Sequence, residues 1–171
     1  SKIIDAIDKS LDVLNNESID YLIRISLFHY LFGYIHPFYD GNGRTSRFIS
    51  SYLLSQKLNN LIGYRISYTI KENIKDYYDA FKICNHYNNK GDLTPFVEMF
   101  LKIVDTSMKQ LHNAVSERYE KLVHYLKLIR DLPNADDESM FRLYDVLIQA
   151  ALFSDTGIAN QELKEYMQMS Y

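Results

Sequence analysis

The chain has no tryptophan, a single cysteine, six glycines and three prolines among its 171 residues. So few glycines and prolines exclude an all-β fold, whose many tight turns depend on these residues. Cys84 has no partner for an intrachain disulfide, which favours a reducing compartment, and its apolar surroundings predict a buried structural thiol. No run of about 18 apolar residues or signal sequence is present. We therefore expect a soluble, cytoplasmic protein.

An excess of positive charge is also missing. The chain carries 19 Lys and Arg against 22 Asp and Glu, a formal net charge of −3. This balance excludes broad, non-specific nucleic-acid binding, which needs a basic surface, but it leaves room for a small local DNA contact. The hydrophobic fraction of 47% and the chain length predict one domain with a real core and room for a small appendage.

Helical periodicity of the apolar residues runs through most of the chain, and we predict an all-α fold. Residues 19–34 are apolar nearly all round, which predicts a central helix buried on most sides, with Ser18 as its N-cap. Pro37 should end that helix at His36. Loops are expected at residues 59–63 and a linker at residues 131–137. The other predicted helices cover residues 3–14, 44–58, 70–87, 94–130 and 140–150, with a short helix after a glycine turn at residue 157.

Between the second and third helices lies a short run that contains the parts of a phosphate site. Gly41 and Gly43 let backbone N–H groups approach an anion, and the helix that follows points its positive end at the same place. Arg44 and Arg47 lie three residues apart on its first turn, so both side chains can lean toward the loop. Guanidinium groups match phosphate oxygens in a bidentate manner. The lysine of a Walker A loop is absent, but the pattern predicts polyphosphate binding.

The same run supplies a base and a carboxylate. A histidine such as His36 suits removal of a hydroxyl proton, and Asp40 can hold a Mg²⁺ ion that bridges phosphates. With the arginines, these groups describe positioning and charge stabilisation in phosphoryl or nucleotidyl transfer. The alternative is that both are ligands of a transition metal, but the further ligands that zinc needs are not nearby.

The run His36-Pro37-Phe38-Tyr39-Asp40-Gly41-Asn42-Gly43-Arg44-Thr45-Ser46-Arg47 resembles the Fic family signature HPFx(D/E)GNGRxxR at every fixed position. The flanks are similar to the family as well: the lead-in to Ile35, and a downstream segment with Tyr77-Tyr78-Asp79-Ala80-Phe81, Asn85, Gly91-Asp92 and Thr94-Pro95-Phe96. The resemblance covers about residues 1–115. It implies a Fic-type helical bundle around the central helix and the loop.

The resemblance also implies an activity, transfer of AMP from ATP to a Ser, Thr or Tyr hydroxyl of a target protein or of the chain itself, with ATP and Mg²⁺ as cofactors. His36 would be the catalytic base and Asp40 the metal ligand. Phe38 would pack into the core and anchor the loop. The implied phosphate-binding set is Gly41, Asn42, Gly43, Arg44 and Arg47, with the Asn42 side chain on the α-phosphate. Tyr77 or Tyr78, and Asn85, would line the adenine and ribose side, although the tyrosine pair is also typical of a helix core.

Residues 131–171 form a separate part of the prediction. A helix, a glycine turn and a second helix ending near Met169 are typical of the start of a winged helix-turn-helix module, and this part resembles the appendage of many bacterial family members. A helical hairpin that only packs is the alternative. We therefore expect a Fic core at residues 1–130, without the family's target-aligning flap, followed by a linker and a truncated winged-helix segment.

Three functional alternatives stay open at this point. One is a DNA-binding regulator in which the core senses nucleotide or modifies itself. Another is a relative that phosphorylates its target, although such relatives depart from the Gly-Asn-Gly-Arg sequence that is intact here. The third is removal of AMP by the same site. A homo-oligomer is a further possibility, and no membrane partner is expected.

Overall fold

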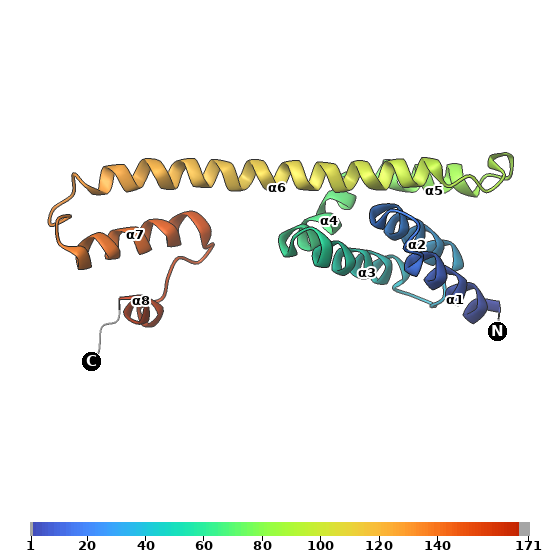
Figure 1. Cartoon of the computed structure of the whole chain (residues 1–171), viewed down its shortest axis with the longest axis horizontal. Coiled ribbons are helices and arrows are strands. Elements are labelled where there is room, and N and C mark those ends of the chain that lie inside the picture. Colours follow the sequence, from blue (N-terminus) through green and yellow to red (C-terminus); the bar gives the residue numbers. More distant parts are fainter. Residues whose placement is uncertain (1, 168–171) are drawn as a thin grey trace. The chain divides into compact units, whose positions relative to one another are not determined.

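The computed structural model describes residues 2–167 and confirms the all-α prediction. Within these residues there are eight α-helices, one short 3₁₀ helix and no strand (Figure 1). No helix in residues 2–167 has both the length and the apolar character that crossing a bilayer would require. In chain order the elements are α1 (Lys2–Asn15), α2 (Tyr21–Ile35), α3 (Asn42–Lys57), α4 (Asn60–Glu72), α5 (Ile74–Asn85), η1 (Tyr87–Asn89), α6 (Thr94–Ile129), α7 (Glu138–Phe153) and α8 (Asn160–Tyr166).

The chain divides into two compact units, Ser1–Leu111 and His112–Tyr171, and the boundary falls inside α6. The sequence analysis instead places the domain boundary after residue 130, between the predicted core and the predicted C-terminal appendage. That division into functional domains stays a prediction. The two units are described separately below.

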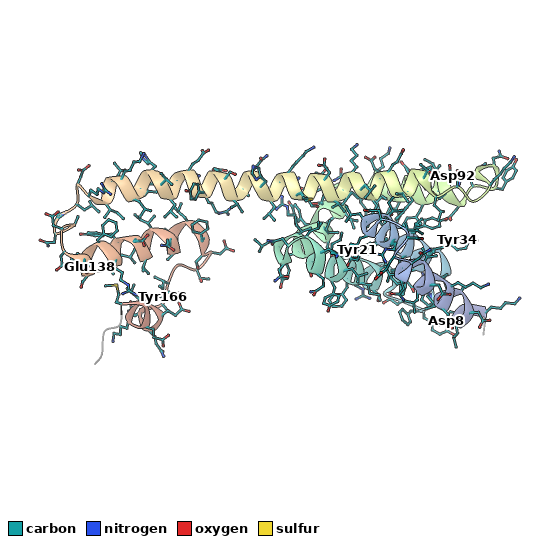
Figure 2. The ribbon with its side chains drawn as sticks, in the orientation of Figure 1. Asp8, Tyr21, Tyr34, Asp92, Glu138 and Tyr166 are labelled. Atoms are coloured by element: carbon teal, nitrogen blue, oxygen red, sulfur yellow. The ribbon has the colours of Figure 1, made fainter. Side chains whose placement is uncertain are left out.

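Helix α2 is the centre of the first unit, as its all-round apolar pattern predicted. It packs against α1 on one side and α3 on another (Figure 1). The hydroxyl of Tyr21, labelled in Figure 2, donates a hydrogen bond of 2.8 Å to the Leu53 carbonyl and so ties the start of α2 to α3. The core around α2 is rich in aromatic rings, and burial of each contributes roughly 1.5–3 kcal/mol. Its fully or nearly fully buried apolar members include Ile25, Tyr30, Leu54, Ile66, Tyr77, Cys84, Phe96 and Phe100.

Both ends of α2 are defined by single residues. Asp20, and not the predicted Ser18, caps the start, because its Oδ1 accepts from the Leu22 N–H at 2.9 Å. The helix ends at Ile35, as predicted. His36 follows in the left-handed conformation with φ of 52° and donates its N–H to the Phe32 carbonyl at 3.1 Å. This C-cap turns the chain away from the helix just before the loop.

The predicted loop at residues 59–63 is wrong, because α4 begins at Asn60, and the predicted helix at residues 70–87 is wrong in its bounds. Asn59 caps α4 through a 2.8 Å bond from the Leu61 N–H, so that Gly63 lies within a helix. A Cβ atom on Gly63 would come within 2.9 Å of the Ser51 carbonyl oxygen, so glycine permits a close crossing of α3 and α4. The chain breaks again at Asn73, where α4 gives way to α5. Gly63 was read as a turn signal because packing between helices cannot be seen in local sequence.

The second unit consists of the later turns of α6 with α7 and α8. Residues 130–137 form turns, close to the predicted linker, and Asp137 caps α7 by accepting from the Met140 N–H at 2.9 Å. Arg118 of α6 donates to the Leu152 carbonyl of α7 at 3.1 Å. Helix α8 ends at Tyr166. The predicted helix end near Met169 lies outside the described residues, and the winged-helix interpretation stays a prediction.

Candidate active site at the start of α3

The loop between α2 and α3 is held closed by one side chain. Asn42, the first residue of α3, is 3% exposed. Its Oδ1 accepts from the Phe38 N–H at 2.9 Å, and its Nδ2 donates to the Phe38 carbonyl at 2.6 Å. The side-chain amide is therefore engaged with the loop backbone, while the predicted contact of this amide with an α-phosphate stays untested. Phe38 itself is 51% exposed and touches Phe32 with ring centroids 6.0 Å apart, so core packing anchors the loop only in part.

His36 stands at the exposed entrance of this loop. Its Nδ1 lies 3.4 Å from the Gly33 carbonyl oxygen. Because a carbonyl only accepts, this contact favours the tautomer with the proton on Nδ1 and the lone pair on Nε2. The lone pair is the feature that a general base requires.

The N-terminus of α3 is suited to an anion. Its cap is Gly41, which has φ of 85° and no side chain to bond the first N–H groups of the helix. Gly43 lies on the first turn, where a Cβ atom would come within 3.1 Å of Arg47 Nη1. The glycine cap leaves the first backbone N–H groups of α3 without a side-chain partner, and Gly43 leaves room for the Arg47 guanidinium beside them. These groups therefore lie together at the positive end of the helix dipole.

Asp40 occupies part of this anion site. Its Oδ1 accepts from the Gly41 N–H at 2.6 Å, and its Oδ2 pairs with Arg44 Nη2 at 2.8 Å. The carboxylate thus engages two groups that the sequence assigned to phosphate. Both side chains of the pair are exposed, so the pair contributes about 0–1 kcal/mol and is easily exchanged for another anion.

Asp40 was also the predicted metal ligand. Mg²⁺ in nucleotide sites is held by one or two carboxylates together with phosphates and water, so a single exposed carboxylate beside the anion site fits such an ion. Within residues 2–167 no three His, Cys, Asp or Glu side chains come together as a metal cluster. A single protein carboxylate suits a metal ion whose other ligands come from phosphates and water.

The residues predicted for the adenine side have three different environments. Tyr77 is 4% exposed, and its hydroxyl lies 2.8 Å from His29 Nε2. Asn85 accepts from the Tyr30 hydroxyl at 2.6 Å. Tyr78 is 55% exposed. The structure therefore places Tyr77 in the core. The sequence analysis had given this as the alternative to a role in lining the nucleotide.

The sequence analysis gave His29 no role in the site. It is fully buried between Ser50 and Tyr77, with Nδ1 2.8 Å from Ser50 Oγ. Burial, and secondarily the positive charge of Arg47, lower its pKa to about 3, so the ring is neutral. Its place in the middle of a helix that is apolar nearly all round was the signal that could have shown its burial.

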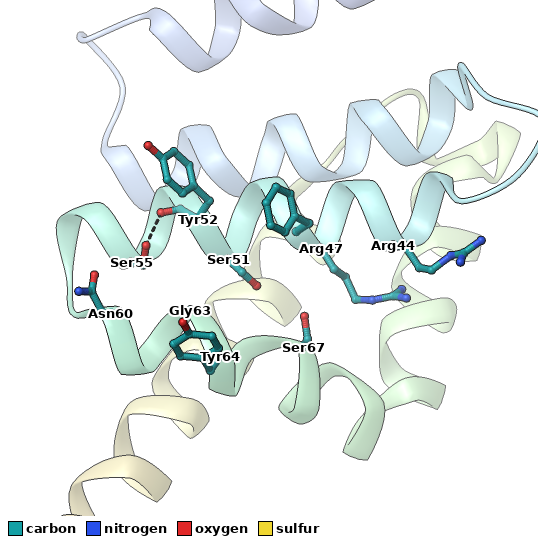
Figure 3. Close-up of a pocket in the computed structure, with 10 residues that line it drawn as sticks. Arg44, Arg47, Ser51, Tyr52, Ser55, Asn60, Gly63, Tyr64 and Ser67 are labelled. Carbon is teal, nitrogen blue, oxygen red and sulfur yellow. Dashed lines mark hydrogen bonds between the residues drawn. The ribbon is translucent and has the colours of Figure 1, made fainter. Parts of the chain in front are cut away.

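A pocket of about 620 Å³ opens beside the arginines, between α3 and α4 (Figure 3). Ser51 of α3 and Ser67 of α4 point into the space between the two helices, next to Arg47. Sequence reasoning found only the arginines among its lining residues. The others recur three or four positions apart along each helix, a spacing that marks one helix face. They are Phe48, Ser51, Tyr52, Ser55, Asn60, Gly63, Tyr64 and Ser67.

Comparison with known proteins supports the interpretation of the loop. Residues 1–54 match the model of the Fic/DOC family, and this stretch includes the whole loop and most of α3. These residues are similar to that family, and we call them the Fic segment. The expected family resemblance is confirmed for this part of the chain. No solved structure matches the chain significantly.

Curated relatives extend the similarity beyond the Fic segment. The protein adenylyltransferase fic-1 of Caenorhabditis elegans is 28% identical over 125 residues, which are 71% of this chain and 23% of the relative. The protein adenylyltransferase Fic of Drosophila erecta is 38% identical over 101 residues, 57% of this chain and 18% of the relative. That of Aedes aegypti is 35% identical over 89 residues, 52% of this chain and 16% of the relative. The chain thus spans less than a quarter of each relative's length.

Proposed function

We propose that the Fic segment transfers AMP from ATP to a hydroxyl group of a protein, either a separate target or the chain itself. The observation that carries the proposal is the loop from His36 to Arg47, in which an exposed histidine precedes a helix N-terminus without a side-chain cap and two arginines near the start of that helix. The similarity to proteins named adenylyltransferases supports the same reaction.

His36 acts on the nucleophile. Its Nε2 accepts the proton of the target hydroxyl, the hydroxyl oxygen forms a bond to the α-phosphorus of ATP, and the bond from that phosphorus to the bridging oxygen breaks. Pyrophosphate leaves with the electron pair of the broken bond. General-base assistance of this kind contributes roughly 10²–10⁴-fold to a rate.

The start of α3 holds the charge that the reaction develops. The backbone N–H groups of Gly41, Asn42 and Gly43 face the α-phosphate, where helix polarity adds to each hydrogen bond. Arg44 and Arg47 hold the outer phosphates through paired N–H groups. Asn42 keeps these amides in place by bracing Phe38.

Asp40 exchanges partners when the nucleotide binds. Its carboxylate would release the Gly41 N–H and Arg44 to phosphate oxygens, and it would then be the side chain that holds the magnesium ion. When bound, the ion supplies charge neutralisation on the phosphates. The exchange is easy because the Asp40–Arg44 pair is exposed.

Two labelled nucleotides test the proposal. The full-length protein is incubated with magnesium and with ATP labelled either at the α-phosphate or at the γ-phosphate, alone and with a lysate of its source organism. Protein labelling from the α-phosphate only, absent in His36→Ala, is the expected result. Labelling from the γ-phosphate would instead establish a kinase. If neither label is transferred although ATP binds, the transfer proposal fails.

A further inference from the structure

The pocket between α3 and α4 has the size and the lining of a site for a small organic anion. We propose that it binds a molecule with a flat apolar body and one acidic group, a carboxylate or a phosphate, whose charge is held by Arg47. The pocket volume of about 620 Å³ lies within the range of about 300–1,000 Å³ that is usual for small-molecule sites. The inference goes beyond the proposed transfer of AMP, and its test measures binding without any transfer step.

The pocket extends away from the loop of residues 36–43, none of which lines it. Its α3 residues run from Arg44 to Ser55, a distance of about 16 Å along the helix at 1.5 Å per residue. Helix α4 supplies the opposite wall (Figure 3). Only Arg44 and Arg47 are shared with the proposed phosphate site, so most of the pocket is made of groups that the nucleotide site does not use.

Aromatic side chains from both helices form much of the apolar lining. Phe48, Tyr52 and Tyr64 line the pocket, and each is more than half exposed. Exposed large apolar side chains that gather at a concave site are typical of a surface that a ligand covers. A flat ring system can contact these rings in the offset or edge-on arrangements that aromatic pairs favour. The lining therefore suits an aromatic or similarly flat body.

The charge of the pocket selects an anion. Within the described part of the chain no aspartate or glutamate lines it, whereas two arginines do. Arg44 is paired with Asp40, but none of the ion pairs formed among residues 2–167 includes Arg47, which is partly buried. A guanidinium without a carboxylate partner attracts an acidic group and can bind it through two parallel N–H donors. We therefore expect the acidic group of the ligand at Arg47.

Ser51 offers a second polar contact. Its Oγ atom is buried and has no hydrogen-bond partner among residues 2–167, and its side chain points into the space between the two helices (Figure 3). Buried hydroxyl groups in native proteins are nearly always hydrogen-bonded, so an unpartnered one at a pocket wall is suited to a bond with a bound molecule. Ser55, Asn60 and Ser67 add further hydrogen-bonding groups to the lining. A few polar groups in a mostly apolar pocket are what fixes the orientation of a ligand.

Two fluorescent dyes with the same ring system test the preference for an anion. 8-Anilinonaphthalene-1-sulfonate carries an acidic group, and N-phenyl-1-naphthylamine is its neutral counterpart. In titrations of the full-length protein, the anionic dye should bind with a Kd of roughly 10–100 µM, as expected for a ligand of its size. It should bind about tenfold more tightly than the neutral dye, the effect of a hydrogen bond to a charged group. Arg47→Gln should abolish this preference, and Arg142→Gln, at an exposed arginine of α7, should retain it.

A pocket-filling variant locates the bound dye. Ser67→Phe adds a ring to the α4 wall and should weaken binding of the anionic dye about tenfold, because the ring takes the volume that the dye needs. Ser139→Phe makes the same change at an exposed serine of α7 and should leave the affinity unaltered. Thermal melts verify that each variant is folded. Competition with 1-naphthoate and with 1-naphthyl phosphate then shows which acidic group the pocket prefers, and displacement of the dye by neither would contradict the proposed ligand class.

Three further results would overturn the inference: equal affinities of the unmodified protein for the two dyes, a preference that survives in Arg47→Gln, or unchanged binding in Ser67→Phe. Displacement of the dye by AMP would also overturn it, because AMP lacks the outer phosphates assigned to Arg47 and would then occupy the pocket itself as part of the nucleotide site. Failure of the proposed function looks different, since a protein that transfers no AMP would still bind the anionic dye in this pocket.

Discussion

Asn42 brackets the backbone of Phe38, accepting from its N–H at 2.9 Å and donating to its carbonyl at 2.6 Å. Both groups would be left without these partners in Asn42→Ala. We expect this variant to lower the free energy of unfolding by about 1–3 kcal/mol and to reduce transfer strongly, because the loop loses its brace. Calorimetry and the labelling assay measure the two effects. Asn88→Ala, at an exposed asparagine, is the control, and an equally small effect of both variants would contradict the bracing role.

His36→Ala should reduce AMP transfer by roughly 10²–10⁴-fold while ATP still binds, because the base acts on the hydroxyl and not on the nucleotide. Single-turnover rates and titration with ATP give the two quantities. His112→Ala changes another exposed histidine and should leave both unaltered. A parental transfer rate in His36→Ala would show that another group removes the proton.

Asp40→Asn should have opposite effects with and without magnesium. With EDTA present, ATP binding should tighten by about twofold to fivefold, because a carboxylate no longer competes for the Gly41 N–H and Arg44. With magnesium present, transfer should fall because the predicted ligand is lost. Asp105→Asn breaks a comparable exposed pair, with Lys109 at 2.7 Å, and serves as the control. Weaker ATP binding in EDTA would contradict the competition.

Gly63→Ala tests the crossing of α3 and α4. Alanine normally stabilises a helix by about 1 kcal/mol relative to glycine, but here its Cβ would meet the Ser51 carbonyl oxygen at 2.9 Å. We expect a net loss of about 1–3 kcal/mol, because backbone must move to relieve the contact. Ser67→Ala, on the same helix and exposed, should show no loss. Thermal melts of both variants measure these changes in stability. A higher melting temperature for Gly63→Ala than for the parent would rule out the close crossing.

Buried His29 should make stability fall in mildly acidic solution. Its pKa is lowered from 6.5 to about 3 on folding, so the unfolded state binds the extra proton between these values and stability is lost as the pH falls below 6.5. The slope is up to about 1.4 kcal/mol per pH unit. Asp79, Asp92 and Glu117 have lowered pKa values and lose their contributions only at more acidic pH, near the titration of free carboxylates.

The range from pH 6.5 to 5 therefore isolates the histidine. Unfolding monitored over this range should show a shallower dependence for His29→Gln than for the parent, whatever the absolute stability of the variant. His86→Gln, at an exposed histidine, should retain the parental slope. Equal slopes for the parent and His29→Gln would show that His29 is not held neutral by burial.

Local sequence was sufficient for the features that depend on neighbours along the chain. The end of α2 before Pro37, the all-α fold and the loop with its two arginines follow from propensities and spacings within a few residues. The helix boundaries at Asn59 and Asn73 were misjudged, because glycine at position 63 and an asparagine cap give the same local signal as a loop.

The sequence by itself determined most of the helices. It also determined the site-bearing stretch of twelve residues from His36 to Arg47, because one continuous segment contains all its chemistry. Only the tertiary structure decided what surrounds them. His29 and Tyr77 are 48 positions apart and Ser50 comes from a third helix, so their hydrogen bonds exist only once α2, α3 and α5 pack together. The pocket beside Arg47 likewise depends on the close approach of α4 at Gly63. Contacts of this kind are set by burial and shape across the core, which no local pattern of residues encodes.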